Sequence, residues 1–203
     1  MPITLPPEYK PYETDESRHP FLKELGVTLD LCLRHKVGFC ETGEYANNII
    51  VPLFNLAGEL VSFATRWPEH WHPDGKVVWR SPLSPMAQGT LFNHVYAAKH
   101  DSIVIVEGFF DAVRVGEHAV ALISARCGAP QLALLTELGQ TRRLTVMHDA
   151  DVPHVGRALA TSLAAMCPDV HLVRTPPGHK HDPSACTTEE LAEAVAAAVR
   201  IVA

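Results

Sequence analysis

Residues 102–113 read SIVIVEGFFDAV, and the fold of the second half of the chain can be worked out from this stretch. Its first part, Ser102 to Val106, is a short apolar run of the kind that builds a buried strand. Glu107 ends the run, and the residues after it predict a helix that begins near Phe110. A carboxylate in this position either caps the following helix or belongs to a site at the end of the strand.

From residue 102 onward, apolar runs of strand length alternate with stretches of helical periodicity. The predicted strands are Ser102–Val106, Ala119–Ile123, Leu144–Met147 and Val170–Val173, and the predicted helices are Phe110–Val115, Pro130–Leu138, Gly156–Met166 and Thr188–Val199. Strands that alternate with helices are joined by right-handed crossovers, so they form a parallel sheet with helices on both faces. The sequence therefore predicts an α/β fold for this half.

The first half of the chain has a different pattern. Residues 1–18 are rich in proline and charge, which predicts an extended arm or linker. Two short helices broken at Gly26 follow, and then two β-branched runs around NLAGE that predict a hairpin. The predicted domains are an arm over residues 1–18, a small α+β lobe over residues 19–100 and the parallel-sheet domain over residues 101–203.

Composition limits the classes of function. The chain has 203 residues, is 47% hydrophobic and 20% charged, and carries a formal net charge of −6. This charge argues against a protein that coats nucleic acid through overall basicity, although it allows a local basic groove. The five cysteines form no CxxC pair and are odd in number, so neither a zinc ribbon nor a disulfide framework is expected.

No membrane segment is expected either. No apolar run approaches the roughly 20 residues that a helix needs to cross a bilayer. The N-terminal sequence MPITLPPEYK lacks the basic and then apolar pattern of a signal peptide. We therefore expect a cytoplasmic protein with no membrane partner.

Acidic residues follow three of the predicted parallel strands. Glu107 follows the first strand, Asp149 and Asp151 follow the third, and Asp182 follows the fourth. In an open parallel sheet, ligands bind beyond the carboxyl ends of the strands, so these side chains are expected at one edge. Crowded carboxylates disfavour one another's charged forms, and Mg²⁺, with its preference for oxygen ligands, relieves that repulsion. The pattern predicts a site for phosphoryl transfer that uses divalent cations.

Asp111 allows two interpretations. It could touch a metal through water, or it could stabilise the first turn of the helix in which it lies. Taken singly, Glu107 and the HDAD segment could also be caps or solvated loops. Their common position at one edge of the sheet is what favours a functional site.

Three acidic segments together carry a resemblance to a known family. IVIVEGFFDAV, VMHDAD and GHKHDP resemble the Toprim domain, which primases, topoisomerases and several nucleases share. Upstream, NNIIVPLFNLAGELVSFATRW, KVVWRSPLSP and GTLFNHVYAAK are similar to segments that precede this domain in DnaG-like primases. The N-terminal segment looks like the form found in phage primases. The chain as a whole resembles the Toprim catalytic core of a DnaG-like, phage-type DNA primase.

The resemblance implies roles for particular residues. Glu107, Asp149 and Asp151 would be the principal catalytic and metal-binding carboxylates, completed by Asp182 and Asp111. The implied cofactor is Mg²⁺ or Mn²⁺. The basic residues implied to contact nucleic acid or nucleotide are Arg66, Lys76, Arg80 and Lys180. Such contacts to phosphates make binding sensitive to salt.

The sequence also departs from the family pattern. The usual DGDxAG is here DADVPHVGRAL, with Ala150 in place of a glycine and about two residues inserted before Gly156. Histidines stand near the predicted acidic site: His148, His154, His179 and His181. Either they are incidental or they bring a softer metal such as Mn²⁺ into play.

The resemblance implies a DNA primase core that joins ribonucleoside triphosphates on a single-stranded DNA template during DNA replication. The sequence as given contains neither the cysteine-rich zinc module nor the helicase part of such proteins, and it leaves open whether a zinc-binding module or a replicative helicase acts in trans. Two alternatives remain. One is a Toprim-type nuclease in which the same acids activate water, and the other is a non-catalytic module that binds nucleic acid or a replication partner.

Overall fold

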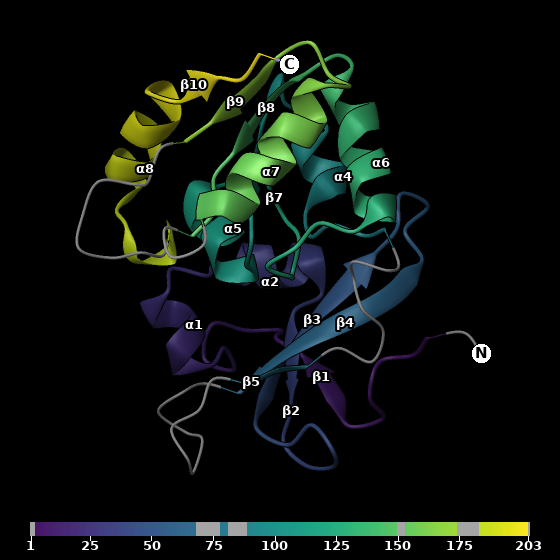
Figure 1. The fold of residues 1–203 in the computed structure, drawn as a ribbon. Helices are drawn as coiled ribbons and strands as arrows, with labels where there is room; N and C mark the ends of the chain where they lie inside the picture. The colour runs from purple at the N-terminus through teal and green to yellow at the C-terminus, as the bar shows by residue number, and fades with distance from the viewer. Residues whose placement is uncertain (1–2, 68–77, 81–88, 150–152, 174–182, 203) are drawn as a thin grey trace. The chain divides into compact units, whose positions relative to one another are not determined.

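The computed structural model describes residues 3–67, 78–80, 89–149, 153–173 and 183–202 (Figure 1). The chain divides into two units, Met1–Ser84 and Pro85–Ala203. No helix in the described ranges is both long and apolar enough to cross a bilayer.

The first unit is built on an antiparallel sheet with the strand order β1-β2-β3-β4-β5. Its strands are β1 (Tyr9–Pro11), β2 (Gly38–Cys40), β3 (Asn48–Phe54), β4 (Leu60–Trp67) and β5 (Val78–Arg80). The predicted hairpin is confirmed as β3 and β4, and its turn contains Gly58 at a φ of 79°. Glycine suits this left-handed position because it has no Cβ.

Two short helices precede the hairpin, α1 (Pro20–Glu24) and α2 (Leu29–His35). The predicted break between them at Gly26 is confirmed, and this residue has a φ of 73°. The Thr28 hydroxyl caps α2 by accepting a hydrogen bond from the Leu31 amide over 3.2 Å.

The N-terminal segment differs from the predicted arm. Residues 9–11 form the edge strand β1, paired antiparallel with β2. Tyr12 follows it and is buried, and its ring stacks on Phe39 with a centroid distance of 5.0 Å. The apolar faces of the aromatic side chains explain why a segment rich in proline and charge is part of the sheet.

The second unit contains the predicted parallel sheet, in the order β10-β9-β8-β6-β7. Its strands are β6 (Ser102–Val106), β7 (Ala119–Ala121), β8 (Arg143–Val146), β9 (Val170–Leu172) and β10 (Val199–Arg200). The pairs β6–β7, β6–β8 and β8–β9 are parallel, whereas β10 is antiparallel to β9. No sequence pattern indicated β10, because its residues continue the alanine-rich pattern of the last helix.

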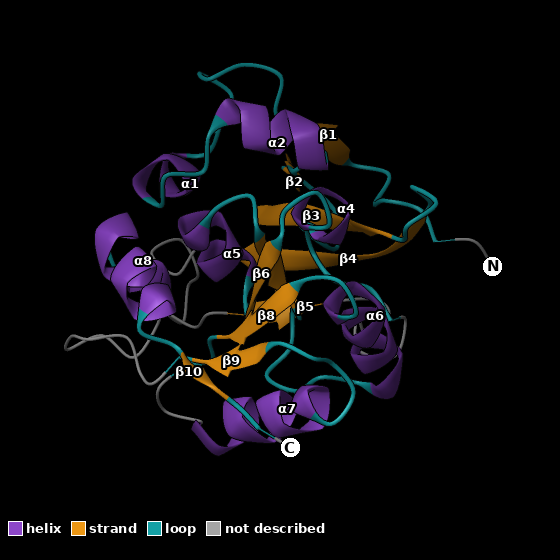
Figure 2. Cartoon of the chain, turned by 90° about the horizontal axis from the view of Figure 1, so that it is seen from above, coloured by secondary structure: helices purple, strands orange, loops and turns teal. Residues whose placement is uncertain are grey.

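Helices cover both faces of this sheet, as Figure 2 shows. They are α4 (His94–Ala97), α5 (Phe109–Val115), α6 (Ala129–Gly139), α7 (Pro153–Ala164) and α8 (Thr188–Ala196), with a short 3-10 helix, η2 (Pro183–Ala185). In Figure 2, α5 and α8 lie on one face, and α6 and α7 lie on the other. The main core consists of buried Leu, Ile and Val side chains of β6, β7, β8, α6 and α7. An α/β fold with a small α+β lobe before it is confirmed.

Two boundaries differ from the sequence prediction. The second unit begins at Pro85 rather than at residue 101. Phe92 forms an antiparallel bridge to Ala121, and the Gln131 side chain donates to the Thr90 and Leu122 carbonyls over 2.8 and 2.9 Å. These bonds tie the segment before β6 to the parallel sheet.

The other boundary is the start of α7. The sequence placed Pro153 and His154 in a turn and started the helix at Gly156. In the structure, α7 begins at Pro153. Proline favours the first position of a helix, because its fixed φ suits the helix and the missing N–H is not needed there.

Candidate active site

The candidate site lies where the strand order of the parallel sheet reverses. β6 has β7 on one side and β8 on the other, so the chain leaves β6 in one direction and later returns to its opposite side. In such sheets, ligands bind outside the carboxyl ends of the strands at this switch point. Glu107 follows β6 directly, and His148 and Asp149 follow the end of β8.

Glu107 is held by both neighbouring strand ends. Its Oε1 lies 2.5 Å from His148 Nδ1 and 3.4 Å from the Asp149 amide nitrogen. Its backbone carbonyl accepts a hydrogen bond from the Ile123 amide over 2.8 Å, just beyond β7. The side chain of Glu107 is 14% exposed. The structure therefore brings Glu107 and the Asp149 backbone together, as the sequence predicted for the edge of the sheet.

His148 is the least exposed member of this group, with 2% of its side chain accessible. Its Nε2 is buried and has no hydrogen-bond partner in the described part of the chain. Gly156 of α7 packs against it, and a Cβ added to Gly156 would lie 2.8 Å from His148 Cβ. The glycine thus allows α7 to approach the end of β8.

Asp111 has a structural role in α5. Its Oδ2 accepts a hydrogen bond from the Gly108 amide over 2.8 Å, and its Oδ1 accepts one from the Ser184 amide over 3.1 Å. Arg114 adds a bond from its Nε to the Ser184 carbonyl over 3.3 Å. The first-turn interpretation of Asp111 is therefore observed, together with a link to η2 that the sequence did not suggest. Metal binding by Asp111 stays a prediction.

Arg66 and Arg80 lie in the antiparallel sheet of the first unit. Arg66, in β4, is paired in register with Ile49, and its guanidinium lies 5.5 Å from the centre of the Phe21 ring. This distance is in the range of a cation–π contact. Arg80, in β5, lies opposite Thr65 in the register. Other predicted residues lie outside the described ranges: Lys76, Ala150, Asp151, His179, Lys180, His181 and Asp182.

Sequence reasoning missed two features of the second unit. Ile123 has a φ of 55°, a left-handed conformation that β-branched residues rarely adopt. No pattern in the sequence signals this backbone conformation.

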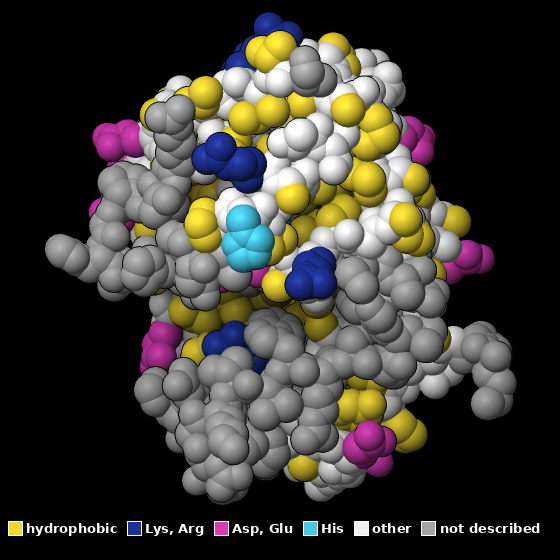
Figure 3. Space-filling model, in the orientation of Figure 1, with side chains coloured by type: hydrophobic (Ala, Val, Ile, Leu, Met, Phe, Trp, Pro, Cys, Tyr) yellow, Lys and Arg dark blue, Asp and Glu magenta, His cyan; other side chains and the backbone are white. Residues whose placement is uncertain are grey.

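The second feature is Arg157, an exposed residue of α7. It lines a surface hollow with Pro153, His154, Ala158 and Thr161. Figure 3 shows histidine and basic side chains on this face, over α7. The spacing of His154 and Arg157 in a helix could have signalled a shared face.

The donors at this edge fit a hard divalent cation. Magnesium takes oxygen ligands, few of them protein carboxylates, and keeps several waters. Glu107 and Asp149 supply carboxylates from adjacent strand ends. Within the described ranges, no group of three or more His, Cys, Asp or Glu residues is arranged to hold a metal ion. The predicted remaining ligands, Asp151 and Asp182, lie outside those ranges.

Comparisons with known proteins give a consistent result. No family model matches the chain. A DNA primase from Staphylococcus epidermidis is 26% identical to it over 191 residues, and a DNA primase from Staphylococcus aureus is 25% identical over 182 residues. The matches cover 84% and 81% of this chain. The chain spans only 31% and 30% of the lengths of these curated relatives.

Solved structures show a similar fold. The primase fragment of the bacteriophage T7 primase-helicase protein superposes with a TM-score of 0.66 at 19% identity, covering 95% of this chain and 81% of that fragment. The DnaG primase catalytic domain bound to single-stranded DNA superposes with a TM-score of 0.68 at 16% identity, covering 89% of this chain and 73% of that domain.

Proposed function

We propose that this chain, which has the fold of the catalytic core of DnaG-like primases, is a nucleotidyltransferase that joins ribonucleotides on a single-stranded DNA template. The observation that carries the proposal is the meeting of Glu107 with the Asp149 segment at the switch point of that fold. The resemblance of the sequence to DNA primases supports the same conclusion. The chain would act during DNA replication in the cytoplasm of a bacterium or a phage-infected cell.

The acidic edge has the chemistry that nucleotidyl transfer needs. Glu107, Asp149, Asp151 and Asp182 would hold Mg²⁺ or Mn²⁺, with Asp111 positioning the segment after Asp182 through its bond to Ser184. When bound, such cations orient the incoming triphosphate and offset the charge that develops on the leaving pyrophosphate. The protein itself would hold the carboxylates in place before the substrate arrives. The hydrogen bonds of Glu107 with His148 Nδ1 and the Asp149 amide support this role.

Basic residues would hold the nucleic acid and the nucleotide. Arg66, Lys76, Arg80 and Lys180 are proposed to contact phosphates. Phosphate contacts of this kind carry little sequence information but raise affinity at low salt. Arg157 and His154 on α7 add a cationic and a polar side chain, six and three residues after Asp151 in the sequence. We propose that the template is single-stranded DNA and that a replicative helicase or a zinc-binding module assists in trans.

The proposal is tested by the products that the chain makes. Incubation with single-stranded DNA, labelled ribonucleotides and Mg²⁺ or Mn²⁺ is expected to yield short new RNA on a gel. Shortened DNA or RNA would instead show a nuclease, and no product with retained DNA binding would show a binding module. Glu107→Gln and Asp149→Asn should abolish synthesis, whereas Glu137→Gln, an exposed change on α6, should not. Activity that persists in the first two variants would contradict the site assignment.

A further inference from the structure

We propose that His148 is a positioning residue that orients the Glu107 carboxylate for a divalent cation and so sets how tightly the site binds that cation. The inference rests on the proposed function, because it takes Glu107 as a metal-binding carboxylate. Its test measures cation binding directly, without primer synthesis.

The contact that carries the inference joins His148 Nδ1 to Glu107 Oε1 over 2.5 Å. A carboxylate accepts hydrogen bonds, so we assign the tautomer in which His148 Nδ1 carries a hydrogen and donates a hydrogen bond to Oε1. The Asp149 amide donates to the same oxygen over a longer distance, 3.4 Å. His148 is therefore the closer of two donors that engage one oxygen of Glu107.

The imidazole ring is fixed by its surroundings. The side chain of His148 is 2% exposed, and Gly156 of α7 leaves no room for a Cβ beside it. The Met147 amide, directly before His148, donates to the Ile105 carbonyl over 2.8 Å and ties this end of β8 to β6. A buried ring on an anchored backbone can hold its partner in one orientation, because the low local dielectric strengthens the bond between them.

Fixing Glu107 has a consequence for cation binding. Its side chain has several rotatable bonds, and the free energy needed to order them is lost from the binding of a cation unless the protein has already ordered them. The bonds from His148 and Asp149 both go to Oε1, and Oε2 makes none with the described residues. Glu107 thus presents one carboxylate oxygen in a defined direction. Removing hydrogen-bond partners that orient metal ligands typically weakens metal affinity about 10–100-fold.

The competing explanation is that His148 only fills space in the core. Two substitutions separate the explanations. Asparagine and leucine have the same branched shape, but only asparagine carries an N–H close to the position of Nδ1. Both remove the imidazole ring, so general damage to packing affects both variants, and the difference between them reports the hydrogen bond to Glu107.

The experiment titrates Mn²⁺ into the full chain without nucleotide and follows free Mn²⁺ by electron paramagnetic resonance. We expect His148→Leu to weaken binding about 10-fold or more, and His148→Asn to stay within roughly three-fold of the unaltered protein. His118→Asn is the control, because His118 is a partly buried histidine that precedes β7 at the opposite end of the sheet. Its affinity for Mn²⁺ should be unchanged. In a Glu107→Gln background, the difference between His148→Asn and His148→Leu should vanish.

Circular dichroism first establishes that the variants are folded. Should His148→Leu fail to fold, His148→Phe takes its place, because it fills the site without offering a donor and is expected to show the same loss. Equal Mn²⁺ affinities in the folded asparagine and leucine (or phenylalanine) variants would overturn the proposal and leave the proposed function standing. An unaltered chain that binds no Mn²⁺ would overturn both this proposal and the metal role assigned to Glu107.

Discussion

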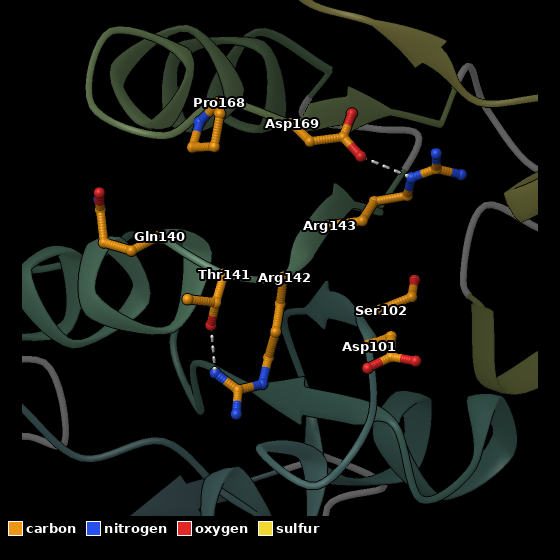
Figure 4. Close-up of a pocket in the computed structure, with 8 residues that line it drawn as sticks. All are labelled: Asp101, Ser102, Gln140, Thr141, Arg142, Arg143, Pro168 and Asp169. Carbon is orange, nitrogen blue, oxygen red and sulfur yellow. Dashed lines mark hydrogen bonds and ion pairs between the residues drawn. The ribbon is translucent and has the colours of Figure 1, made fainter.

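The two edges of the parallel sheet carry charged side chains in different arrangements. At the amino edge, a pocket is lined by Asp101, Ser102, Gln140, Thr141, Arg142, Arg143, Pro168 and Asp169 (Figure 4). There, Arg143 pairs with Asp169 over 3.0 Å, and Arg142 donates to the Ala98 carbonyl and to the Thr141 hydroxyl, each over 3.0 Å. Arg142, Arg143 and Asp169 are thus each paired or hydrogen-bonded within the fold itself.

At the carboxyl edge, Glu107 has a different kind of partner. The side chain that hydrogen-bonds to Glu107 in the described chain is that of a histidine, His148, and not of a lysine or arginine. This glutamate is largely buried and meets a second acidic residue, Asp149. Asp169 is paired with an arginine at the amino edge, whereas Glu107 lies beside the Asp149 segment at the carboxyl edge, the arrangement that we propose for binding a cation. The two edges thus differ in the partners of their carboxylates: an arginine for Asp169, and a histidine and a backbone amide for Glu107.

The largest effect should come from exchanging Glu107 at the carboxyl edge, with Asp169 at the amino edge as the matched comparison. Glu107→Gln is expected to reduce primer synthesis roughly 100-fold or more, because a neutral amide cannot balance the positive charge of a bound cation. Its unfolding free energy should change by less than about 1 kcal/mol, since the amide oxygen still accepts from His148 and Asp149. Asp169→Asn should leave synthesis unchanged. Synthesis assays and denaturant unfolding of both variants measure these effects, and a loss of synthesis in Asp169→Asn would contradict the distinction between the two edges.

Gly156→Ala should damage the carboxyl edge through packing alone. The added Cβ would lie 2.8 Å from His148 Cβ, so α7 or His148 must move. We expect a loss of about 1–3 kcal/mol in unfolding free energy. If His148 moves away from Glu107, Mn²⁺ affinity falls as well. Ala158→Gly, at an exposed position of the same helix, is the control. It should cost about 0.5–1 kcal/mol without altering Mn²⁺ affinity.

Much of this arrangement could be predicted from the sequence. The alternation of apolar runs and helical stretches predicted the parallel sheet, because each run is nearly uniformly apolar and is buried on both faces. Because both residues follow parallel strands, this topology also predicted that Glu107 and Asp149 lie at the carboxyl edge of the sheet. The bond between Glu107 and His148 was not predictable, although His148 had been named as a neighbour of the acids. Which side chain approaches which carboxylate depends on how closely α7 packs, and that depends on Gly156.

Other features depend on contacts between residues distant in sequence. Residues 89–100 belong with the parallel sheet partly because the Gln131 side chain donates hydrogen bonds to the Thr90 and Leu122 carbonyls. No local sequence pattern predicts these hydrogen bonds. Tyr12 joins the first sheet through its stacking on Phe39, although its flanking residues are typical of a linker. Local composition predicts local structure, and these contacts are selected by packing across the fold.

Asp111→Asn tests the distinction between a structural and a metal-binding carboxylate. Asp111 accepts from the Gly108 and Ser184 amides, and an asparagine can accept through only one oxygen. We expect a loss of about 1–3 kcal/mol in unfolding free energy in the absence of any metal, because a largely buried amide loses its partner. Thermal unfolding in excess chelator measures it. Unchanged stability together with weakened Mn²⁺ binding would show that Asp111 binds metal rather than stabilising the fold.

The smallest effect concerns acid stability at the amino edge. The hydrogen bond from Arg143, together with that from His171, lowers the pKa of Asp169 below its usual range. A carboxylate with a lowered pKa in the folded state contributes stability that is present above about pH 4, and this stability is lost as the pH falls through the folded-state value. Because Asp169 and Arg143 are substantially exposed, the contribution should be at most about 1 kcal/mol and should shrink in high salt. Unfolding measured from pH 6 to pH 3 should show a shallower loss in Asp169→Asn than in the unaltered chain, and identical profiles would show that the charges of this edge contribute nothing to stability.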